Sequence, residues 1–336
     1  MKTITIASLR AEPGSKTHGF LEVVRRGDGS PVGLPLTILN GVDEGPTLVA
    51  DACHHGDEYE GAEVILKMVQ TLNPKKLKGA FIGVHAINVP GFLARTRGNP
   101  EDWDPGHMDF NRVYPGRSDG SMTERIVHTY FSEIVPKADC VISFHGGGDT
   151  WYCGPLAVYD SASGSEAGKK SIEYASATGI ELMLEEPPGN PISGALLKTA
   201  LKRSIPTITV ELGGHCDRYQ NREKLVNTGI MAITNVMKHL RMIEGRPELS
   251  RKQVAVEVAG FIHCSKGGLQ FPKVKTLDRV KKGDIITMIV NPWTGEEVER
   301  ITAPHDGIIT LILAQPMAKP GDWIVGVGRI TKDITN

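Results

Sequence analysis

The sequence has few cysteines, almost no net charge and no apolar run of membrane-spanning length. Its five cysteines are odd in number and form no Cys-x-x-Cys pair, which argues against a cysteine zinc site and favours reduced thiols. The formal net charge of −1 gives no long-range attraction to nucleic acid or to an anionic membrane. The N-terminus also lacks the apolar core of a signal peptide. We therefore expect a cytoplasmic protein without nucleic-acid or membrane partners.

Phosphate-binding patterns are missing as well. The glycine run at 146–148 is accompanied by no Gly-x-Gly-x-x-Gly or Gly-Lys-Ser/Thr pattern, so no nucleotide site is predicted. With 336 residues, the chain is long enough for one large core and a smaller one.

Residues 1–245 alternate strand-like and helix-like segments. The apolar patterns predict strands at 34–39, 47–50, 81–87, 140–144 and 207–211, and helices at 61–72, 123–134, 166–178, 194–202 and 224–240. Such alternation predicts an α/β fold in which a mixed, mostly parallel sheet is flanked by helices. Ligand sites in these folds lie at the carboxyl ends of the strands.

The pattern changes after a polar joint that contains glycine and proline. Residues 251–336 carry short β-branched runs separated by turns, which predict a smaller, all-β domain. The segments 303–309 and 317–324 resemble the two halves of a biotinyl/lipoyl-like β-barrel. We expect this barrel-like domain to pack against the mouth of the functional site.

His55 and Glu58 lie three positions apart, where a predicted strand ends and a predicted helix begins. This spacing can direct an imidazole nitrogen and a carboxylate toward one Zn²⁺. A chain with 11 histidines also produces such a pair by chance, so the pair alone is a weak motif. His145 is the third candidate ligand, because it ends a buried-strand pattern and is followed by glycines that leave space. His54 lacks the three-residue spacing and is expected to pack or to support the ligands.

A catalytic zinc site has three protein ligands, an open position for water and a carboxylate near that water. Glu211 is the candidate for this carboxylate, since it closes a β-branched run and is followed by glycines. An acid there costs free energy unless it is paired or takes part in chemistry. A Glu exposed at the strand end is the alternative. His215 and Cys216 are expected at the pocket mouth. His107 is expected on the surface, with a substrate contact as the alternative.

Four segments follow one another along the chain: His55-Gly-Asp-Glu58, Asp109-Phe-Asn-Arg-Val-Tyr-Pro-Gly116, Phe144-His145 and Thr209-Val-Glu-Leu-Gly-Gly214. In this order they resemble the signatures of the succinylglutamate desuccinylase/aspartoacylase family, relatives of the zinc carboxypeptidases. The resemblance extends from about residue 40 to 330 and implies a zinc carboxypeptidase-like fold. It implies that His55, Glu58 and His145 hold one Zn²⁺ per subunit, and that Glu211 is the general base.

The resemblance also implies substrate contacts. Asn111 and Arg112 match the family's Asp-x-Asn-Arg segment, whose Asn-Arg pair binds the free carboxylate of the substrate. A guanidinium can hold a carboxylate through two parallel hydrogen bonds, although Arg112 as a surface ion-pair partner is the alternative. The family places a carbonyl-polarising arginine between the first two motifs, where Arg97 is preferred and Arg95 is the substitute.

The implied activity is that of a zinc metallohydrolase, an EC 3.5.1-type deacylase that cleaves the amide bond of a small N-acyl amino acid. The amino-acid sequence of residues 55–61 resembles that of the matching segment in deacetylases acting on N-acetylated diamino acids. A metallocarboxypeptidase that removes C-terminal residues from peptides is the nearer alternative, and a non-catalytic metabolite-binding protein the distant one. The compact C-terminal domain, a feature of the deacylase branch, favours small substrates. A homo-oligomer is the commoner default for such chains.

Overall fold

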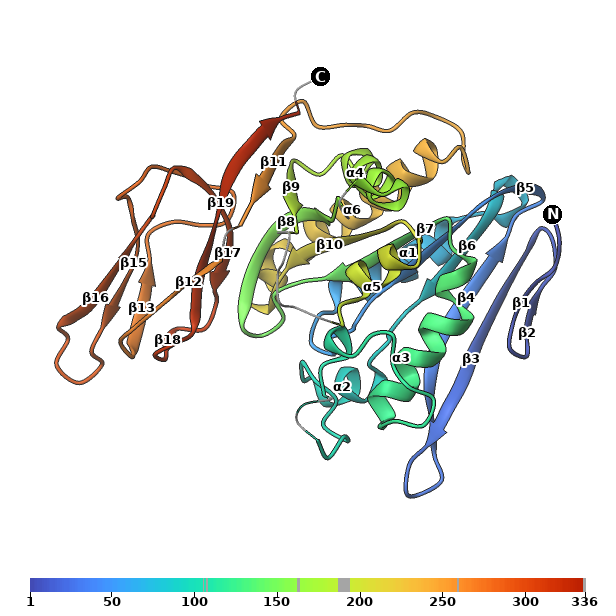
Figure 1. Ribbon diagram of the computed structural model, residues 1–336, viewed down its shortest axis with the longest axis horizontal. Coiled ribbons are helices and arrows are strands. Elements are labelled where there is room, and N and C mark those ends of the chain that lie inside the picture. The colour runs from blue at the N-terminus through green and yellow to red at the C-terminus, as the bar shows by residue number, and fades with distance from the viewer. Residues whose placement is uncertain (105, 107, 162–163, 187–193, 259, 335–336) are drawn as a thin grey trace.

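The computed structural model describes residues 1–104, 106, 108–161, 164–186, 194–258 and 260–334, except for the side chains at 215–218. A large sheet with helices occupies the centre of the molecule, and a C-terminal β-rich region extends from one side of it (Figure 1). A small hairpin of β1 (Ile4–Ile6) and β2 (Leu9–Ala11) lies at the other side.

The elements of the central part follow the predicted alternation. The strands are β3 (Ser15–Arg25), β4 (Pro31–Asn40), β5 (Asp43–Asp51), β6 (Lys78–Val84), β7 (Cys140–His145), β8 (Trp151–Tyr159), β9 (Leu182–Glu185) and β10 (Thr207–Gly213). The helices are α1 (Glu60–Thr71), α2 (Val89–Ala94), α3 (Met122–Glu133), α4 (Glu166–Ala177), α5 (Leu196–Lys202) and α6 (His215–His239).

All the predicted strands and helices of this part are present, with three notable differences. Helix α6 begins at His215 rather than at residue 224. Strand β3 was not predicted, because most of its side chains are polar and only partly covered at the end of the sheet. Strands β8 and β9 were not predicted either, because β8 contains Gly154 and Pro155, which interrupt a strand pattern, and β9 is short.

In the described residues, thirteen strands form one mixed sheet in the order β14-β17-β19-β11-β9-β8-β10-β7-β5-β6-β4-β3, with β12 paired to β19. The prediction of a mixed sheet with helices is confirmed. Parallel pairs occur in two groups: β5 pairs with β6 and β7, and β7 with β10, while β9 pairs with β8 and β11. The expectation of a mostly parallel sheet was too broad, because β3, β4 and the C-terminal strands add antiparallel pairs.

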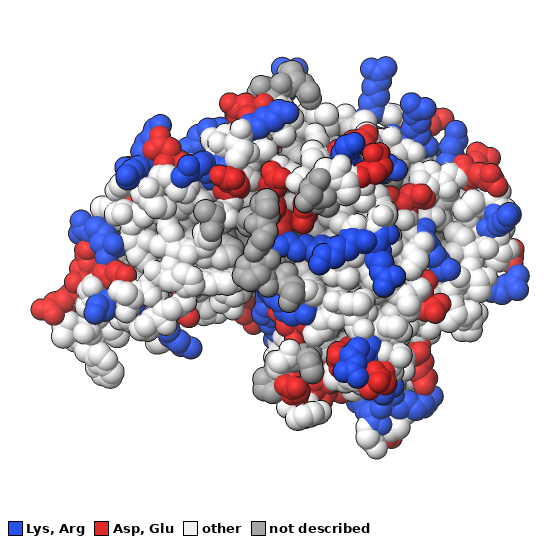
Figure 2. Space-filling view, in the orientation of Figure 1, with Lys and Arg blue, Asp and Glu red and all other residues white. Residues whose placement is uncertain are grey.

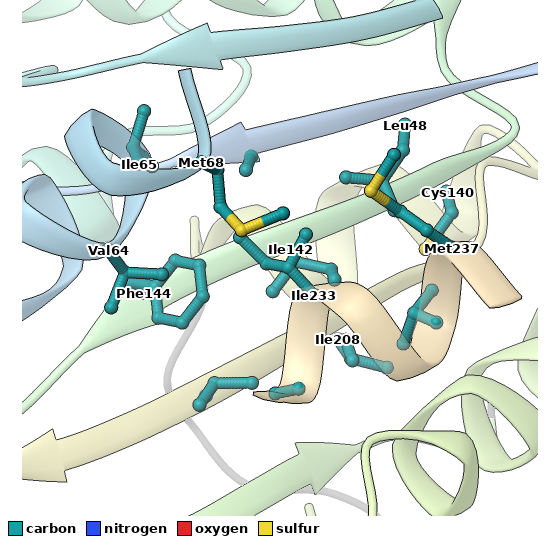
Figure 3. Packing of buried hydrophobic residues seen from close by; sticks show 14 of the residues in the cluster. Leu48, Val64, Ile65, Met68, Cys140, Ile142, Phe144, Ile208, Ile233 and Met237 are labelled. Atoms are coloured by element: carbon teal, nitrogen blue, oxygen red, sulfur yellow. The ribbon is translucent and has the colours of Figure 1, made fainter. Parts of the chain in front are cut away.

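The two faces of the sheet carry different helices, because successive side chains of a strand point to opposite faces. On one face, Leu48 of β5 and Ile142 and Phe144 of β7 pack with α1, α4 and α6. Figure 3 shows this core, with side chains of α1 and α6 directed at the strands. On the other face, Val49 and Val141 pack with α3 and α5. Side chains two positions after these valines therefore point toward α3 and α5.

The C-terminal elements are β11 (Val254–Glu257), β12 (Phe261–His263), β13 (Gly268–Pro272), β14 (Arg279–Val280), β15 (Ile285–Val290), β16 (Glu297–Thr302), β17 (Gly307–Leu313), β18 (Met317–Ala318) and β19 (Trp323–Asp333). The predicted β-rich region is confirmed. It has its own four-stranded sheet, β16-β15-β13-β18, while β11 and β17 join the main sheet by pairing with β9 and β8. The domain boundary at 245–251 and the barrel form stay predictions.

On the face shown in Figure 2, acidic and basic side chains are interspersed, and a broad area over the C-terminal region carries neither. This mixture agrees with the near-zero net charge. No helix in the described part of the chain combines the length and the apolar character needed to cross a membrane.

Candidate metal centre

Two parallel strands and the turn after β5 bring the candidate ligands together. His55 and Glu58 lie in the turn between β5 and α1, where the Glu58 amide donates to the His55 carbonyl oxygen at 3.2 Å. Cys53 has a φ of 56° in this turn, and its thiol donates to the Glu58 carbonyl oxygen at 3.2 Å. His145 is the last residue of β7, which pairs in parallel with β5. The carboxyl ends of both strands therefore lie side by side.

The three candidate ligands form a compact buried cluster. The Nδ1 atom of His55 lies 2.7 Å from Glu58 Oε1, and Nδ1 of His145 lies 3.0 Å from Glu58 Oε2. One ligand atom from each of the three residues lies within 4.8 Å of the others. Two imidazole nitrogens and one carboxylate oxygen are the donor set of catalytic zinc sites that keep a position open for water. The residues present therefore fit a zinc ion.

Burial sets the protonation of this cluster. Burial lowers the pKa of His145 to about 4, so its imidazole is neutral and has a lone pair to offer a metal. Burial opposes ionisation of Glu58, but the charge of His55 and hydrogen bonds from both imidazoles outweigh it. The pKa of Glu58 is therefore well below its usual range, and the carboxylate is ionised.

Asp109 orients the first histidine. Its Oδ1 atom lies 3.2 Å from Nε2 of His55, which is the ring nitrogen that faces away from Glu58. Contacts of this kind fix the tautomer and the ring direction of a metal-ligating histidine. Asp109 belongs to the second sequence motif, from which no role was predicted for it. The available signal was its place in the same motif as Asn111 and Arg112.

A buried polar network lies behind His145. The ring of His54 stacks on that of His145, with centroids 5.1 Å apart and planes at 21°. Nδ1 of His54 lies 3.2 Å from the carboxylate of Asp51. The hydroxyls of Tyr130 and Ser143 donate to the same carboxylate at 2.5 and 2.7 Å. His54 thus lies beside the ligands without belonging to the cluster, as the spacing argument expected.

Glu211 lies next to the cluster because of strand register. Strand β10 pairs in parallel with β7, and Glu211 is directly opposite His145. Its neighbours in β10, Val210 and Leu212, point into the opposite core, so Glu211 faces the same side of the sheet as His145. Burial, with the negative charge of Glu58, raises the pKa of Glu211 to about 8. This pKa belongs to the metal-free protein; the positive charge of a metal ion held beside Glu211 would favour the ionised form that a general base needs.

These groups line a cavity of about 710 Å³. Its wall includes all seven site residues selected from the sequence: His55, Glu58, Arg97, Asn111, Arg112, His145 and Glu211. The C-terminal region also contributes to the wall, through Val258, Gly260, Phe261, Thr310, Leu311 and Trp323. The expectation that this region shapes the site therefore agrees with the structure.

The structure separates the two candidate arginines. Nη1 of Arg97 lies 3.3 Å from Glu58 Oε1, and its Nε lies 3.8 Å from Asp109 Oδ2. Arg95 adopts a left-handed conformation as the C-cap of α2 and is not among the described residues of the cavity wall. Of the two arginines, Arg97 is the one that lines the cavity in the described part of the chain.

Asn111 and Arg112 reach the cavity from a short 3-10 turn, Phe110–Arg112. Oδ1 of Asn111 accepts a hydrogen bond from the Leu196 amide at 2.9 Å, which fixes the side chain against the start of α5. Arg112 donates from Nη1 to the Asn111 carbonyl oxygen at 2.9 Å. His107 lies outside the described residues, as do the side chains of His215 and Cys216.

The mixed sheet, its helices and the buried His-Glu-His cluster place the protein in the class of α/β proteins with a candidate metal centre at the carboxyl ends of the strands. Within that class, the chain belongs to the succinylglutamate desuccinylase/aspartoacylase family. The sequence model of this protein family, described as the succinylglutamate desuccinylase/aspartoacylase catalytic domain, matches residues 44–240, which is more than half of the chain.

Individual relatives resemble the chain over nearly its whole length. The N-alpha-acetyl-L-2,4-diaminobutyric acid deacetylase of Halomonas elongata is 27% identical, and the match covers 98% of this chain and 96% of that protein. The product-bound ectoine utilization protein EutE of Ruegeria pomeroyi is 26% identical with a TM-score of 0.84, over 93% of this chain and 95% of that one. A succinylglutamate desuccinylase from Silicibacter sp. has a TM-score of 0.86 at 23% identity, over 97% of both chains, and supports the fold.

Proposed function

We propose that this protein is a zinc-dependent deacylase that hydrolyses the amide bond of a small N-acyl amino acid. The observation that carries the proposal is the buried cluster of His55, Glu58 and His145 with Glu211 directly across the strand pair. Within this class, the name of the Halomonas elongata relative favours an N-acetylated diamino acid as the substrate.

The ligand set would be His55, Glu58 and His145, with Asp109 holding the His55 ring. When bound, Zn²⁺ supplies a Lewis acid that polarises the amide carbonyl and makes water a stronger nucleophile at neutral pH. The other residues of the cavity then account for proton transfer, charge stabilisation and substrate orientation.

Glu211 acts as the general base that removes a proton from the attacking water, and it later delivers that proton to the departing nitrogen. Arg97 stabilises the negative charge that develops on the carbonyl oxygen. Its guanidinium is a preorganised charge that acts on the transition state rather than a tight contact to the ground state. Asn111 and Arg112 hold the free carboxylate of the amino acid. The products are a carboxylate and a free amino acid.

The cavity favours a small substrate over a peptide. Its volume of about 710 Å³ is in the range of small-molecule sites, roughly 300–1,000 Å³. Part of its wall comes from β12, β17 and β19, which lie over the site from the C-terminal region. A carboxypeptidase must instead accommodate a chain that continues away from the scissile bond.

Metal analysis and a substrate panel test the proposal. We expect one zinc per chain, and faster hydrolysis of N-acetyl-2,4-diaminobutyrate than of N-acetylaspartate, N-succinylglutamate or a blocked dipeptide. Glu211→Gln should keep the zinc and lose turnover, whereas Glu133→Gln, on the exposed end of α3, is the matched control. Preferred cleavage of the dipeptide would replace the proposal with a carboxypeptidase, and full activity after zinc removal would refute it.

A further inference from the structure

Trp151 contacts the arginine of the candidate centre. It is the first residue of β8, it lines the cavity, and the centroid of its ring lies 5.7 Å from Cζ of Arg97. A guanidinium within about 6 Å of an indole centroid is attracted by the negative face of the ring. Besides this ring, Arg97 has two ion-pair partners in the described residues, Glu58 and Asp109. One aromatic ring and two carboxylates therefore set the place of this guanidinium.

The C-terminal region holds the Trp151 side chain. Nε1 of Trp151 donates to the Trp323 carbonyl oxygen at 3.2 Å, and the two rings are 5.6 Å apart. Trp323 in turn stacks on Phe261, with centroids 4.3 Å apart and planes at 17°. Trp151 also packs on the apolar core of the C-terminal region. A row of three aromatic rings thus runs from the C-terminal region to Arg97.

The backbone around Trp151 is attached to the same region. Trp151 pairs with Leu313 of β17, and the Ala314 amide donates to the Thr150 carbonyl oxygen at 2.9 Å. The Gln315 side chain donates to the carbonyl oxygen of Asp149. These contacts fix the backbone at the start of β8, from which the Trp151 ring projects.

We propose that Trp151 is a positioning residue for Arg97, through which the C-terminal region acts on the site. The inference rests on the proposed function, because it takes Arg97 as the group that stabilises the carbonyl oxygen. The Arg97 side chain is 35% exposed and has many rotamers, so its ion pairs alone leave it free to move toward solvent. Small displacements of a catalytic charge reduce transition-state stabilisation strongly.

Substitutions at the ring and at its support should therefore reduce turnover in a graded way. Trp151→Leu should lower kcat by about two- to fivefold for loss of the cation–π contact, with KM nearly unchanged. Trp151→Phe keeps an aromatic face, so its kcat should be close to that of the wild type. Trp323→Leu should have a smaller effect in the same direction, because it removes the support of the ring and leaves the ring itself. Trp293→Leu, at a residue that is 93% exposed, is the matched control.

A double-mutant cycle between Trp151→Leu and Arg97→Ala separates positioning from a general structural role. If Trp151 acts through Arg97, its substitution should cost almost nothing once Arg97 is gone. Equal losses in both backgrounds, or a change in KM alone, would overturn the inference. Zinc content and urea unfolding of each variant report on the fold, and Trp151→Phe and Trp323→Leu give the same cycle if Trp151→Leu does not fold.

The two proposals fail in different ways. If Arg97→Ala leaves turnover unchanged, the role of Arg97 in the proposed function is wrong, and the inference about Trp151 is overturned with it. If Arg97→Ala reduces turnover but its effect simply multiplies with that of Trp151→Leu, the proposed function stands and only the inference is overturned.

Discussion

Replacing Glu211 by Gln removes one ionisable group and keeps the shape of the side chain. In the folded, metal-free protein, burial and the charge of Glu58 raise the pKa of Glu211 from 4.5 to about 8. In the unfolded chain the same carboxyl ionises near 4.5. Between these values the folded state binds one proton more than the unfolded state, so the stability of the metal-free protein falls as the pH rises.

The size of the effect follows from the two pKa values. Stability changes by about 1.36 kcal/mol per pH unit across the window from 4.5 to about 8, so the upper bound is about 5 kcal/mol. At pH 5 the protonated Glu211 resembles Gln, and the two proteins should be almost equally stable. At pH 9 the wild type contains an ionised carboxylate at the partly buried position of Glu211, and the variant should be more stable by up to about 5 kcal/mol.

Urea unfolding of both metal-free proteins from pH 5 to 9 measures this difference directly. The difference should be near zero at pH 5 and increase steadily up to about pH 8. A difference that does not vary with pH would show that Glu211 ionises normally and would refute the reasoning. With zinc present, the variant should lose activity by a factor of about 10² to 10⁴, the usual contribution of a general base.

Three further predictions follow from the geometry. Asp109→Asn should weaken zinc binding by about 10- to 100-fold in a chelator competition, because it loosens the His55 ring; unchanged affinity would remove this role. Arg112→Ala should raise KM for N-acetyl amino acids but not for the matching amides without a carboxylate, and equal effects on both would reject the anchor. Tyr130→Phe should reduce the free energy of unfolding by about 1–3 kcal/mol, since it removes a buried donor to Asp51; a change below the error of the urea titration would contradict this estimate.

Local sequence determined the part of the site that depends on neighbouring residues. His55 and Glu58 are three positions apart in one turn, so their side chains can approach each other whatever the rest of the chain does. The ends of the runs at 140–144 and 207–211 marked where His145 and Glu211 leave buried strands. The order of the four motifs also indicated the family, which the match over residues 44–240 bears out.

The contacts between distant segments were decided by the tertiary structure alone. An alternating apolar pattern says which face of a strand is buried, but it does not say which strand lies beside it or in what register. The facing positions of His145 and Glu211, the ion pair of Arg97 with Glu58, and the contact from Trp151 arise only after β7, β8 and β10 have paired. The sequence determined which residues could do chemistry, and sheet pairing decided which of them meet, because a hydrogen-bonded ladder fixes the distance between chains that are otherwise free to lie apart.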